Sequence, residues 1–462
     1  SSKVRVIDDA CAGKQSLLTD DSNKLSFCNA LEPAVHTRAL VEAHGAKQAP
    51  WLPCEIAIGT EDWPNAYRHV PVRPDQARWF IVAYVDVKEG GTRYLVYKSM
   101  LFGLPAAVTG FNRWPRFVQS MSRRILSILT TFYFDDSLTT DWAKGVAQES
   151  LAKFVGILGT PFSPKKSRPP DDENVFLGLN ANVKEARSEG RVVFWVKDEF
   201  HDKVKESLDE VIRADYLPPG TASKLYGQVG FLNEGTFGKV GRAGLQRLNE
   251  RQHERGITAI DSDLRSSLEL ILAVMKLRPK RTVWCVNRGG NRFVGASDAA
   301  QENPGRGSGG FLVHFCPGSR LGAVVRCKPS MVLWSSSEKQ IAQLEMLQVI
   351  MALLCFPTEF KGKSGVWYID NTASLFALCK GRSLSSDLDK MAAMVHGLLF
   401  AYQCTMYFEW VESEANWTDS ISRLGHGDKF HKQNGFRVHD AEVPLLLWKL
   451  PWTAFLAVAG FL

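Results

Sequence analysis

The sequence predicts an α+β fold in more than one domain. Its 462 residues exceed the size at which a single hydrophobic core keeps growing, so two or three domains are expected. Hydrophobic, aromatic and charged shares of 45%, 11% and 23% are typical of a globular chain with ample core. Short apolar runs of strand length also alternate with helical patterns in two separate regions. These observations exclude a fibrous repeat and a disordered chain.

The first two regions differ in pattern. Residues 1–195 mix short apolar strands with helices, and the spacing of Leu151 and Val155 marks one helix face. Residues 196–285 are rich in charge and in helix formers, and Pro218-Pro219-Gly220 separates two helical runs. We therefore expect a mixed region followed by a small helical domain.

The third region, residues 286–430, predicts an α/β domain. A helix is expected after the capping-box spacing of Ser337 and Gln340, with Leu344 on its apolar stripe. Four strands are expected around this helix, at residues 293–297, 311–315, 321–327 and 366–369.

The last region, residues 431–462, is an apolar extension. Pro444, Lys449 and Pro451 interrupt it, and its unbroken apolar stretch is much shorter than a bilayer span. We therefore expect an extension that packs on the last domain, or a cut end whose partner segment is missing. A membrane anchor is the weaker alternative, and no membrane partner is expected.

Charge and cysteine usage restrict the compartment. The net charge of +7 permits nucleic-acid binding without establishing it. The nine cysteines are scattered, and no two form a C-x-x-C pair, which argues against a disulfide framework and a zinc finger. No signal peptide opens the chain. These features favour a cytoplasmic or nuclear protein.

The first candidate site contains two adjacent carboxylates in Phe132-Tyr133-Phe134-Asp135-Asp136. An isolated Asp-Asp pair in a predicted hairpin is more often a solvated turn than a metal site. Further motifs surround it: Asp62 after an apolar run and five residues before a tyrosine, then Leu101-Phe102-Gly103-Leu104-Pro105, then Lys165-Lys166, and finally Phe176-Leu177-Gly178.

In this order the motifs resemble those of reverse transcriptases. Among them the reverse transcriptases of DIRS-like retroelements are the nearest resemblance, through the opening Lys3-Val4-Arg5-Val6-Ile7-Asp8-Asp9. The resemblance implies a right-hand polymerase of fingers, palm and thumb. The motif around Phe102 departs from the family pattern, because Leu101 of Met100-Leu101-Phe102-Gly103 stands where a proline is usual, which puts rate or fidelity in doubt.

The resemblance also implies roles for individual residues. Asp62, Asp135 and Asp136 would hold two divalent ions, because hard cations such as Mg²⁺ prefer oxygen ligands. Tyr67 would exclude a 2′-hydroxyl and so select deoxyribonucleotides. The remaining substrate-binding residues would line the nucleotide pocket, approach the triphosphate or serve the pyrophosphate leaving group: Phe102 and Gly103, Asn65 and Arg5, and Lys166 with Lys165 as the alternative.

The second candidate site is a series of four acids, Asp298, Glu345, Asp370 and Asp419. Each acid alone is best interpreted as a surface residue, but the ordered series downstream of the polymerase motifs resembles RNase H. That resemblance implies that four carboxylates hold two ions, Mg²⁺ with Mn²⁺ as an alternative, which activate water against an RNA phosphate. The histidine loop of cellular relatives is not visible between Glu412 and Ala415.

The sequence therefore predicts fingers and palm in residues 1–195, a helical thumb or connection in 196–285, and an RNase H-like domain in 286–430. The expected activities are RNA-directed DNA polymerase and ribonuclease H, with an RNA or DNA template, primer, dNTPs and RNA–DNA hybrid as partners. The sequence does not indicate an oligomeric state. Two alternatives remain: a catalytically silent, retroelement-derived nucleic-acid-binding or assembly subunit, and an RNA-dependent RNA polymerase, which Tyr67 and the RNase H series disfavour.

Overall fold

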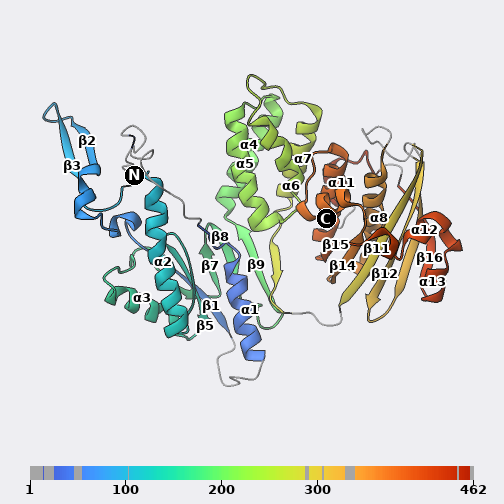
Figure 1. The fold of residues 1–462 in the computed structure, drawn as a ribbon, viewed down its shortest axis with the longest axis horizontal. Helices are drawn as coiled ribbons and strands as arrows, with labels where there is room; N and C mark the ends of the chain where they lie inside the picture. The colour runs from blue at the N-terminus through green and yellow to red at the C-terminus, as the bar shows by residue number, and fades with distance from the viewer. Residues whose placement is uncertain are drawn as a thin grey trace. The chain divides into compact units, whose positions relative to one another are not determined.

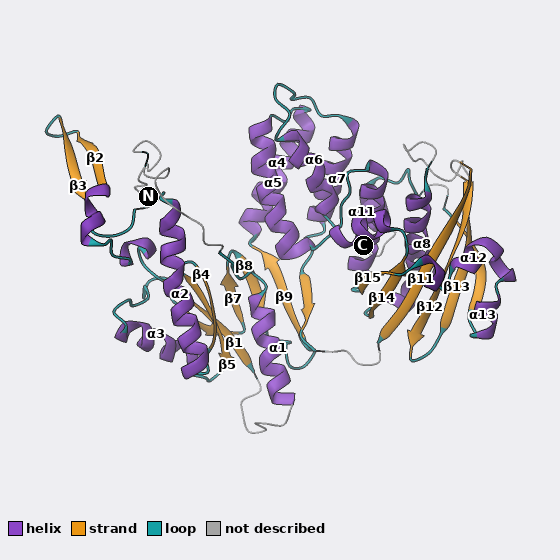
Figure 2. Ribbon diagram, in the orientation of Figure 1, coloured by secondary structure: helices purple, strands orange, loops and turns teal. Residues whose placement is uncertain are grey.

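The computed structural model describes residues 14, 25–45, 55–101, 103–286, 291–303, 306–327, 339–444 and 447–457. The chain divides into two compact units. Unit 1 comprises Ser1–Phe194 with Val283–Val286, and unit 2 comprises Trp195–Thr282 with Asn287–Leu462. Both units combine helices with strands, as Figures 1 and 2 show, which confirms the predicted mixture of helix and sheet.

A four-stranded antiparallel sheet forms the centre of unit 1, in the order β4-β5-β1-β6. Trp63, directly after the β1 strand, is 1% exposed, and its ring stacks on Phe132 at 4.9 Å. Two helices, α2 and α3, bury Phe111 and Leu151 in the same apolar cluster. The elements around this sheet are α1 (Glu32–Gly45), β1 (Ile56–Asp62), α2 (Pro105–Ile125), β4 (Leu129–Tyr133), β5 (Asp136–Trp142), α3 (Ala147–Ile157) and β6 (Arg168–Asp171).

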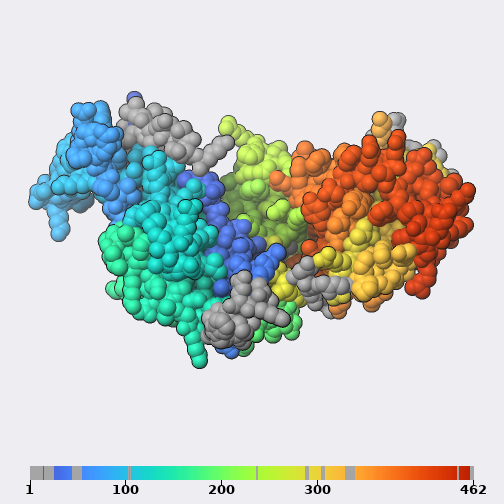
Figure 3. All heavy atoms as spheres, turned by 60° about the horizontal axis from the view of Figure 1, so that its bottom comes forward, coloured from blue at the N-terminus to red at the C-terminus, as the bar shows by residue number. Residues whose placement is uncertain are grey.

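Two smaller sheets complete this part of the chain. The β2–β3 hairpin projects from the rest of unit 1 (Figure 3), and all six residues of β3 are exposed. The other sheet has the order β10-β9-β8-β7, and the boundary between the two units falls within β9 and β10. These elements are η2 (Ala66–His69), η3 (Pro74–Trp79), β2 (Ile81–Asp86), β3 (Gly91–Val96), β7 (Glu173–Phe176), β8 (Leu179–Asn182), β9 (Arg191–Val196) and β10 (Arg281–Trp284).

Unit 2 begins with four helices. In the first, Val204, Leu208 and Val211 repeat at helical spacing and are buried, so one face of the helix joins a core. The fourth begins where the Asp261 carboxylate accepts a hydrogen bond from the Leu264 amide at 2.8 Å, a side-chain N-cap. The helices are α4 (Asp198–Ala214), α5 (Pro219–Leu232), α6 (Arg242–Arg251) and α7 (Ser262–Lys276).

A six-stranded mixed sheet dominates the rest of unit 2, in the order β15-β14-β11-β12-β13-β16. β11 pairs with β12 in antiparallel and with β14 in parallel fashion. The strands are β11 (Arg292–Asn303), β12 (Arg306–Cys316), β13 (Arg320–Cys327), β14 (Ser364–Ile369), β15 (Thr405–Trp410) and β16 (Arg437–Glu442). The helices are α8 (Ile341–Cys355), α9 (Pro357–Phe360), α10 (Thr372–Lys380), α11 (Ser386–Ala401), α12 (Asp419–Leu424), α13 (Lys429–Gln433) and α14 (Trp452–Leu456).

Two adjacent glycines of β12 show that helices cover both faces of this sheet. A Cβ atom at Gly309 would lie 2.3 Å from the Gln348 side chain of α8, and one at Gly310 would lie 2.9 Å from Ile421 of α12. Because neighbouring residues of a strand point to opposite faces, α8 and α12 lie on opposite faces of the sheet.

The structure confirms the four strands that were predicted in this region and lengthens them. Since β11 continues to Asn303, Asp298 lies within the strand and not just past its end. The sequence predicted an apolar stripe along one side of α8. In the structure this helix is buried on every side from Gln343 to Leu353, because the sheet and α11 both cover it. Its expected cap residue Ser337 lies outside the described residues.

The C-terminal region does not behave as a single apolar extension. β16 adds an edge strand to the six-stranded sheet, beyond the boundary expected at residue 430. After it, Trp448 and Phe455 are buried, the Trp448 carbonyl accepts from Lys390 of α11 at 2.9 Å, and Trp452 donates to Ser266 of α7 at 3.3 Å. This segment therefore packs on two helices of its own unit. Within the part of the chain that the structure describes, no helix has the length and apolar character needed to span a membrane.

Candidate active sites

The register of the central sheet in unit 1 brings two predicted metal ligands together. Asp62 at the end of β1 pairs with Asp136 at the start of β5. Directly opposite residues on antiparallel strands point to the same face, so both carboxylates lie on one side of the sheet. Asp135 occupies the turn before β5, where its carbonyl accepts a hydrogen bond from the Trp63 amide at 3.0 Å. This hydrogen bond joins the turn to the residue that follows Asp62.

The turn that carries Asp135 has an unusual backbone. Phe134 adopts a φ of 52°, in the left-handed region that bulky side chains rarely enter. Such a conformation costs on the order of 1–3 kcal/mol and persists only where surrounding contacts enforce it. Here the Phe134 ring stacks on Phe27 at 4.8 Å, and the Gln119 side chain accepts from the Phe132 amide at 3.1 Å. These contacts hold the two aspartates beside Asp62.

The neighbouring carboxylates affect the proton affinity of Asp136. Burial of the carboxyl group raises the pKa of Asp136 to about 6, and the negative charges of Asp135 and Asp62 add to this rise. Burial, together with the charge of Asp135, also raises the pKa of Tyr67. The Lys166 ammonium partly offsets the pKa rise of Asp136. The site therefore concentrates negative charge that a cation would neutralise.

Lys166 belongs to a loop that contacts the last two residues of β1, Glu61 and Asp62. Its ammonium forms an ion pair with Asp62. The next residue, Ser167, donates a hydrogen bond to the buried Glu61 carboxylate at 2.9 Å, which also accepts from Gln148 of α3 at 2.6 Å. Sequence reasoning missed the roles of Glu61 and Gln148, because no motif connects residues so far apart along the chain.

The other residues predicted to bind substrate are placed less closely. Tyr67 lies in η2 with its ring edge-on to Phe111 at 5.3 Å, and Asn65, which precedes η2, is exposed with a φ of 59°. Gly103 is exposed with a φ of 88°, a conformation that favours glycine. Lys165 is exposed and lines a cavity of about 400 Å³ together with Lys166, Asp62 and Asp136. Arg5 and Phe102 lie outside the described residues.

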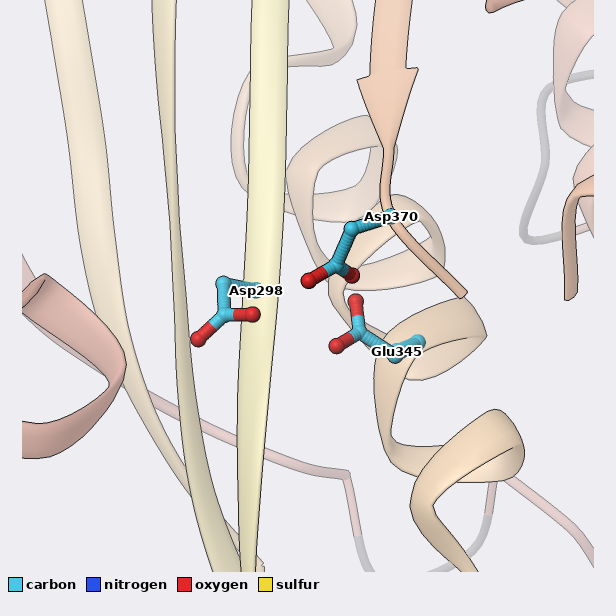
Figure 4. A group of neighbouring side chains, drawn as sticks. All are labelled: Asp298, Glu345 and Asp370. Atoms are coloured by element: carbon cyan, nitrogen blue, oxygen red, sulfur yellow. The ribbon is translucent and has the colours of Figure 1, made fainter. Parts of the chain in front are cut away.

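The second site gathers three carboxylates from three elements. Asp298 lies in β11, Glu345 in α8, and Asp370 directly after β14. β11 and β14 run parallel, and Ala296 of β11 pairs with Tyr368 of β14. Asp298 and Asp370 each follow this pair by two residues, so the register places them at the same level of the sheet. Figure 4 shows the three side chains converging, and one oxygen of each lies within 4.8 Å of the others. Within the described ranges, this is the group of three acidic, histidine or cysteine side chains close enough to share an ion.

Burial makes two carboxyl groups of this second site, those of Glu345 and Asp298, costly to ionise. Glu345 is 2% exposed, and its burial and the charges of Asp298 and Asp370 hold its pKa well above the usual range. Burial raises the pKa of Asp298 to about 6; the Ser422 hydroxyl opposes that rise, whereas the charges of Asp370 and Asp419 add to it. Buried carboxylates such as those of Glu345 and Asp298 are stable as ions only beside positive charge.

Each acid of this site also has a hydrogen-bond donor or cation from the protein. The Ala299 amide donates to Glu345 at 3.0 Å, and the Ser413 hydroxyl donates to Asp370 at 2.8 Å. The Ser422 hydroxyl donates to Asp298, and Arg423 pairs with Asp419 at 2.8 Å. Asp419, the first residue of α12, is not a member of the three-carboxylate group. The sequence contained a signal for Ser422, since it stands one helical turn after Asp419, but not for its contact with Asp298.

The residues of the second site fit a hard divalent cation. The Glu345 Oε2 atom is buried and accepts no hydrogen bond from the described part of the chain. An unpaired carboxylate oxygen beside two further carboxylates is the donor set that Mg²⁺ or Mn²⁺ prefers. Asp62, Asp135 and Asp136 are also all-oxygen donors, but their three oxygens do not meet the 4.8 Å spacing in the described structure. The fit is therefore closer at the second site than at the first.

Comparisons with known proteins add little to this geometry. No family model and no curated protein matches the sequence. Solved structures that match include a foamy viral protease-reverse transcriptase dRH with ds DNA, at 15% identity and a TM-score of 0.40, covering 84% of this chain and 60% of that one. A foamy viral protease-reverse transcriptase with RNA/DNA hybrid matches at 16% identity and a TM-score of 0.39, covering 78% of this chain and 44% of that one. This chain thus spans less than two thirds of either, and scores this low do not establish a common fold.

Proposed function

We propose that this chain is an RNA-directed DNA polymerase with ribonuclease H activity, and that each of its two sites uses divalent metal ions, Mg²⁺ with Mn²⁺ as an alternative. The observation that carries the proposal is the convergence of Asp298, Glu345 and Asp370, with an unpaired, buried oxygen on Glu345. The matched position of Asp62 and Asp136 across β1 and β5 supports the polymerase half.

In the ribonuclease half, the protein contributes a preformed set of ligands. Asp298, Glu345 and Asp370 would hold two ions, and Asp419 would extend the set from α12. Bound ions would supply the activation of water and the neutralisation of charge on an RNA phosphate. The chain's own part is to fix the carboxylates through strand register and through donors such as the Ala299 amide, so that little rearrangement is needed on binding.

In the polymerase half, Asp62, Asp135 and Asp136 would hold the ions beside the primer end and the nucleotide triphosphate. Lys166, close to Asp62, would stabilise or protonate the pyrophosphate leaving group. Tyr67 would meet the sugar and exclude a 2′-hydroxyl. Asn65, Gly103 and Lys165 stay proposed substrate contacts, as do Arg5 and Phe102 outside the described residues.

The domain roles follow from these sites. We assign fingers and palm to residues 1–195, a thumb or connection to the helices of 196–285, and the ribonuclease H-like domain to the six-stranded sheet and its helices. Template, primer, dNTPs and RNA–DNA hybrid are the proposed partners, and the cytoplasm or nucleus is the proposed location. The DIRS-like type rests on Lys3 to Asp9, which lie outside the described residues.

A paired activity assay tests the proposal. Primer extension on RNA and DNA templates, and cleavage of an RNA–DNA hybrid, are measured with Mg²⁺ for the parent chain, Asp135→Asn and Glu345→Gln. Asp135→Asn is expected to abolish extension and to retain cleavage, and Glu345→Gln is expected to do the reverse. Each variant thus serves as the folding control for the other.

The same assay decides between the alternatives. A parent chain that binds hybrid but neither extends nor cleaves it would favour the catalytically silent binding subunit. DNA synthesis that survives Asp135→Asn would refute the polymerase assignment. Preferential incorporation of ribonucleotides would favour an RNA-dependent RNA polymerase.

A further inference from the structure

We propose that Ser422 is a positioning residue for Asp298: its hydroxyl group holds one carboxylate oxygen of Asp298, so that the other faces Glu345 and Asp370. This inference rests on the proposed function of the ribonuclease H-like site and adds a residue to it. Ser422 contacts the side chain of a proposed metal ligand, so its action is through Asp298.

Strand geometry explains why Ser422 can reach Asp298. Asp298 pairs with Gly310 across β11 and β12, and directly paired residues point to the same face of a sheet. Gly310 faces α12, because a Cβ atom there would lie 2.9 Å from Ile421. The Asp298 side chain therefore leaves the sheet on the side where Ser422 is buried, at 2% exposure.

The two oxygens of Asp298 have different surroundings. Figure 4 shows one of them directed toward Glu345 and Asp370 and the other directed away from both. The Oδ2 atom accepts the hydrogen bond from the Ser422 hydroxyl. An oxygen occupied by a donor is a poorer metal ligand, so this contact leaves the other oxygen for the ion.

The Ser422 hydroxyl has a second acceptor within reach, the Asp419 carbonyl at 2.8 Å. A hydroxyl has a single proton to donate, and an ionised carboxylate is a stronger acceptor than a neutral carbonyl. Donation to Asp298 is therefore favoured whenever the site is charged. Without that donor, the terminal torsion of the Asp298 side chain is soft, and repulsion from Glu345 and Asp370 would turn the carboxylate away.

Other contacts hold α12 on the sheet and do not involve the Ser422 hydroxyl. The Ser308 hydroxyl of β12 donates to the Ser422 carbonyl at 2.7 Å. The Asn416 side chain donates to the Ser297 carbonyl at 3.0 Å. Removing the Ser422 hydroxyl is therefore expected to leave α12 in place and to change only the Asp298 carboxylate. Ser308→Ala is a matched control, because it removes a contact of α12 with the sheet and leaves the Ser422 hydroxyl unchanged.

The test measures metal binding directly, in the full chain. An Asp62→Asn, Asp136→Asn background weakens the polymerase site, and Mn²⁺ binding is followed by electron paramagnetic resonance for this parent, Ser422→Ala and Ser308→Ala. Ser422→Ala is expected to weaken Mn²⁺ binding about 10-fold, as is typical when a partner of a metal ligand is lost, and Ser308→Ala by less than about two-fold. Cleavage of hybrid by Ser422→Ala should recover as Mn²⁺ is raised, because the defect lies in ion affinity.

Two results would overturn the inference. Equal Mn²⁺ affinity in Ser422→Ala and the parent would show that the hydroxyl does not position Asp298. Equal losses in Ser422→Ala and Ser308→Ala would assign the effect to the seating of α12. If Ser422→Ala does not fold, Ser422→Cys, which keeps the size but donates weakly, is expected to show the same loss. A parent that binds no Mn²⁺, or that binds it equally after Glu345→Gln, would instead overturn the proposed function of the site and the inference with it.

Discussion

The two carboxylate sites are assembled by different routes. Asp62 and Asp136 meet within one antiparallel sheet, by direct pairing of adjacent strands, and the side chain of their neighbour Lys166 is 46% exposed. Asp298, Glu345 and Asp370 come from a strand, a helix and the end of another strand, and Glu345 is only 2% exposed. The first site contains its own cation, whereas the three central residues of the second are all carboxylates, and two of them, Asp298 and Glu345, are buried.

This difference indicates how each site accommodates the negative charge of its carboxylates. At the first site the Lys166 ammonium offsets part of the repulsion, so the aspartates can stay together without a metal ion. At the second site burial and mutual repulsion raise the pKa values of Glu345 and Asp298, and these rises are opposed by hydrogen-bond donors and, for Asp298, by the charge of Arg423. The second site should therefore depend more strongly on a metal ion for its order.

Apart from the loss of a metal ligand, the largest expected effect concerns Lys166. Lys166→Gln should lower the rate of primer extension by about 10²–10⁴-fold, the usual range for loss of a positioned proton donor. Cleavage of hybrid should not change, because Lys166 belongs to the first site alone. Single-turnover extension and cleavage assays measure both. Lys165→Gln is the control, and an equal loss there would move the role to Lys165 or to general phosphate attraction.

Tyr67 offers a sharper contrast, since the first site is proposed to exclude a nucleotide with a 2′-hydroxyl, whereas the second is proposed to cleave the RNA strand of a hybrid. Tyr67→Val should raise the use of ribonucleotides relative to deoxyribonucleotides by about 10- to 200-fold, because the side chain that fills the space next to C2′ is shortened. Competition between dNTP and rNTP in primer extension measures this ratio. Tyr67→Phe keeps the ring and should keep the discrimination; a relaxed ratio in that control would attribute selection to the hydroxyl.

Within the second site, Asp419 should matter less than the three central acids. Asp419→Asn should reduce hybrid cleavage by about 10-fold, because Asp419 lies outside the close group and is already paired with Arg423. Glu345→Gln should cost about 10³-fold, since loss of an ion removes several kcal/mol of charge stabilisation. Hybrid cleavage at saturating Mg²⁺ compares them. Equal losses would show that metal binding draws Asp419 into the group.

The smallest expected effect is on the stability of the metal-free protein. Glu345 has a folded-state pKa above its unfolded value, so the folded state binds its proton more tightly, and stability declines as pH rises above the usual range of a glutamate. Glu345→Gln lacks this decline. In EDTA at pH 8 it should raise the free energy of unfolding by about 1–3 kcal/mol, with the gap closing toward pH 4.

Asp62→Asn is the matched comparison at the first site. It removes the partner of a half-exposed lysine, so stability should change by less than about 1 kcal/mol. Denaturant unfolding across pH measures both variants. If Asp62→Asn raised the free energy of unfolding as much as Glu345→Gln does, the two sites would not differ in how they tolerate their negative charge.

The sequence by itself determined the local elements of this protein and the candidate ligands that they carry. Runs of alternating and helical apolar residues predicted the strands around Asp298 and the helix of Glu345, and the spacing of Asp62, Tyr67 and Asp135 marked a candidate polymerase site. These features are local, because strand and helix periodicity and motif order depend on near neighbours along the chain.

Only the tertiary structure decided which residues act on one another. That β1 pairs with β5 in the register that opposes Asp62 and Asp136, that Lys166 reaches Asp62, and that Ser422 reaches Asp298 from 124 residues away all depend on packing. The left-handed backbone at Phe134 and the burial of α8 on every side were equally invisible in the sequence. The physical reason is that hydrogen bonds, desolvation and repulsion act through space, over distances of a few ångströms that chain separation does not encode.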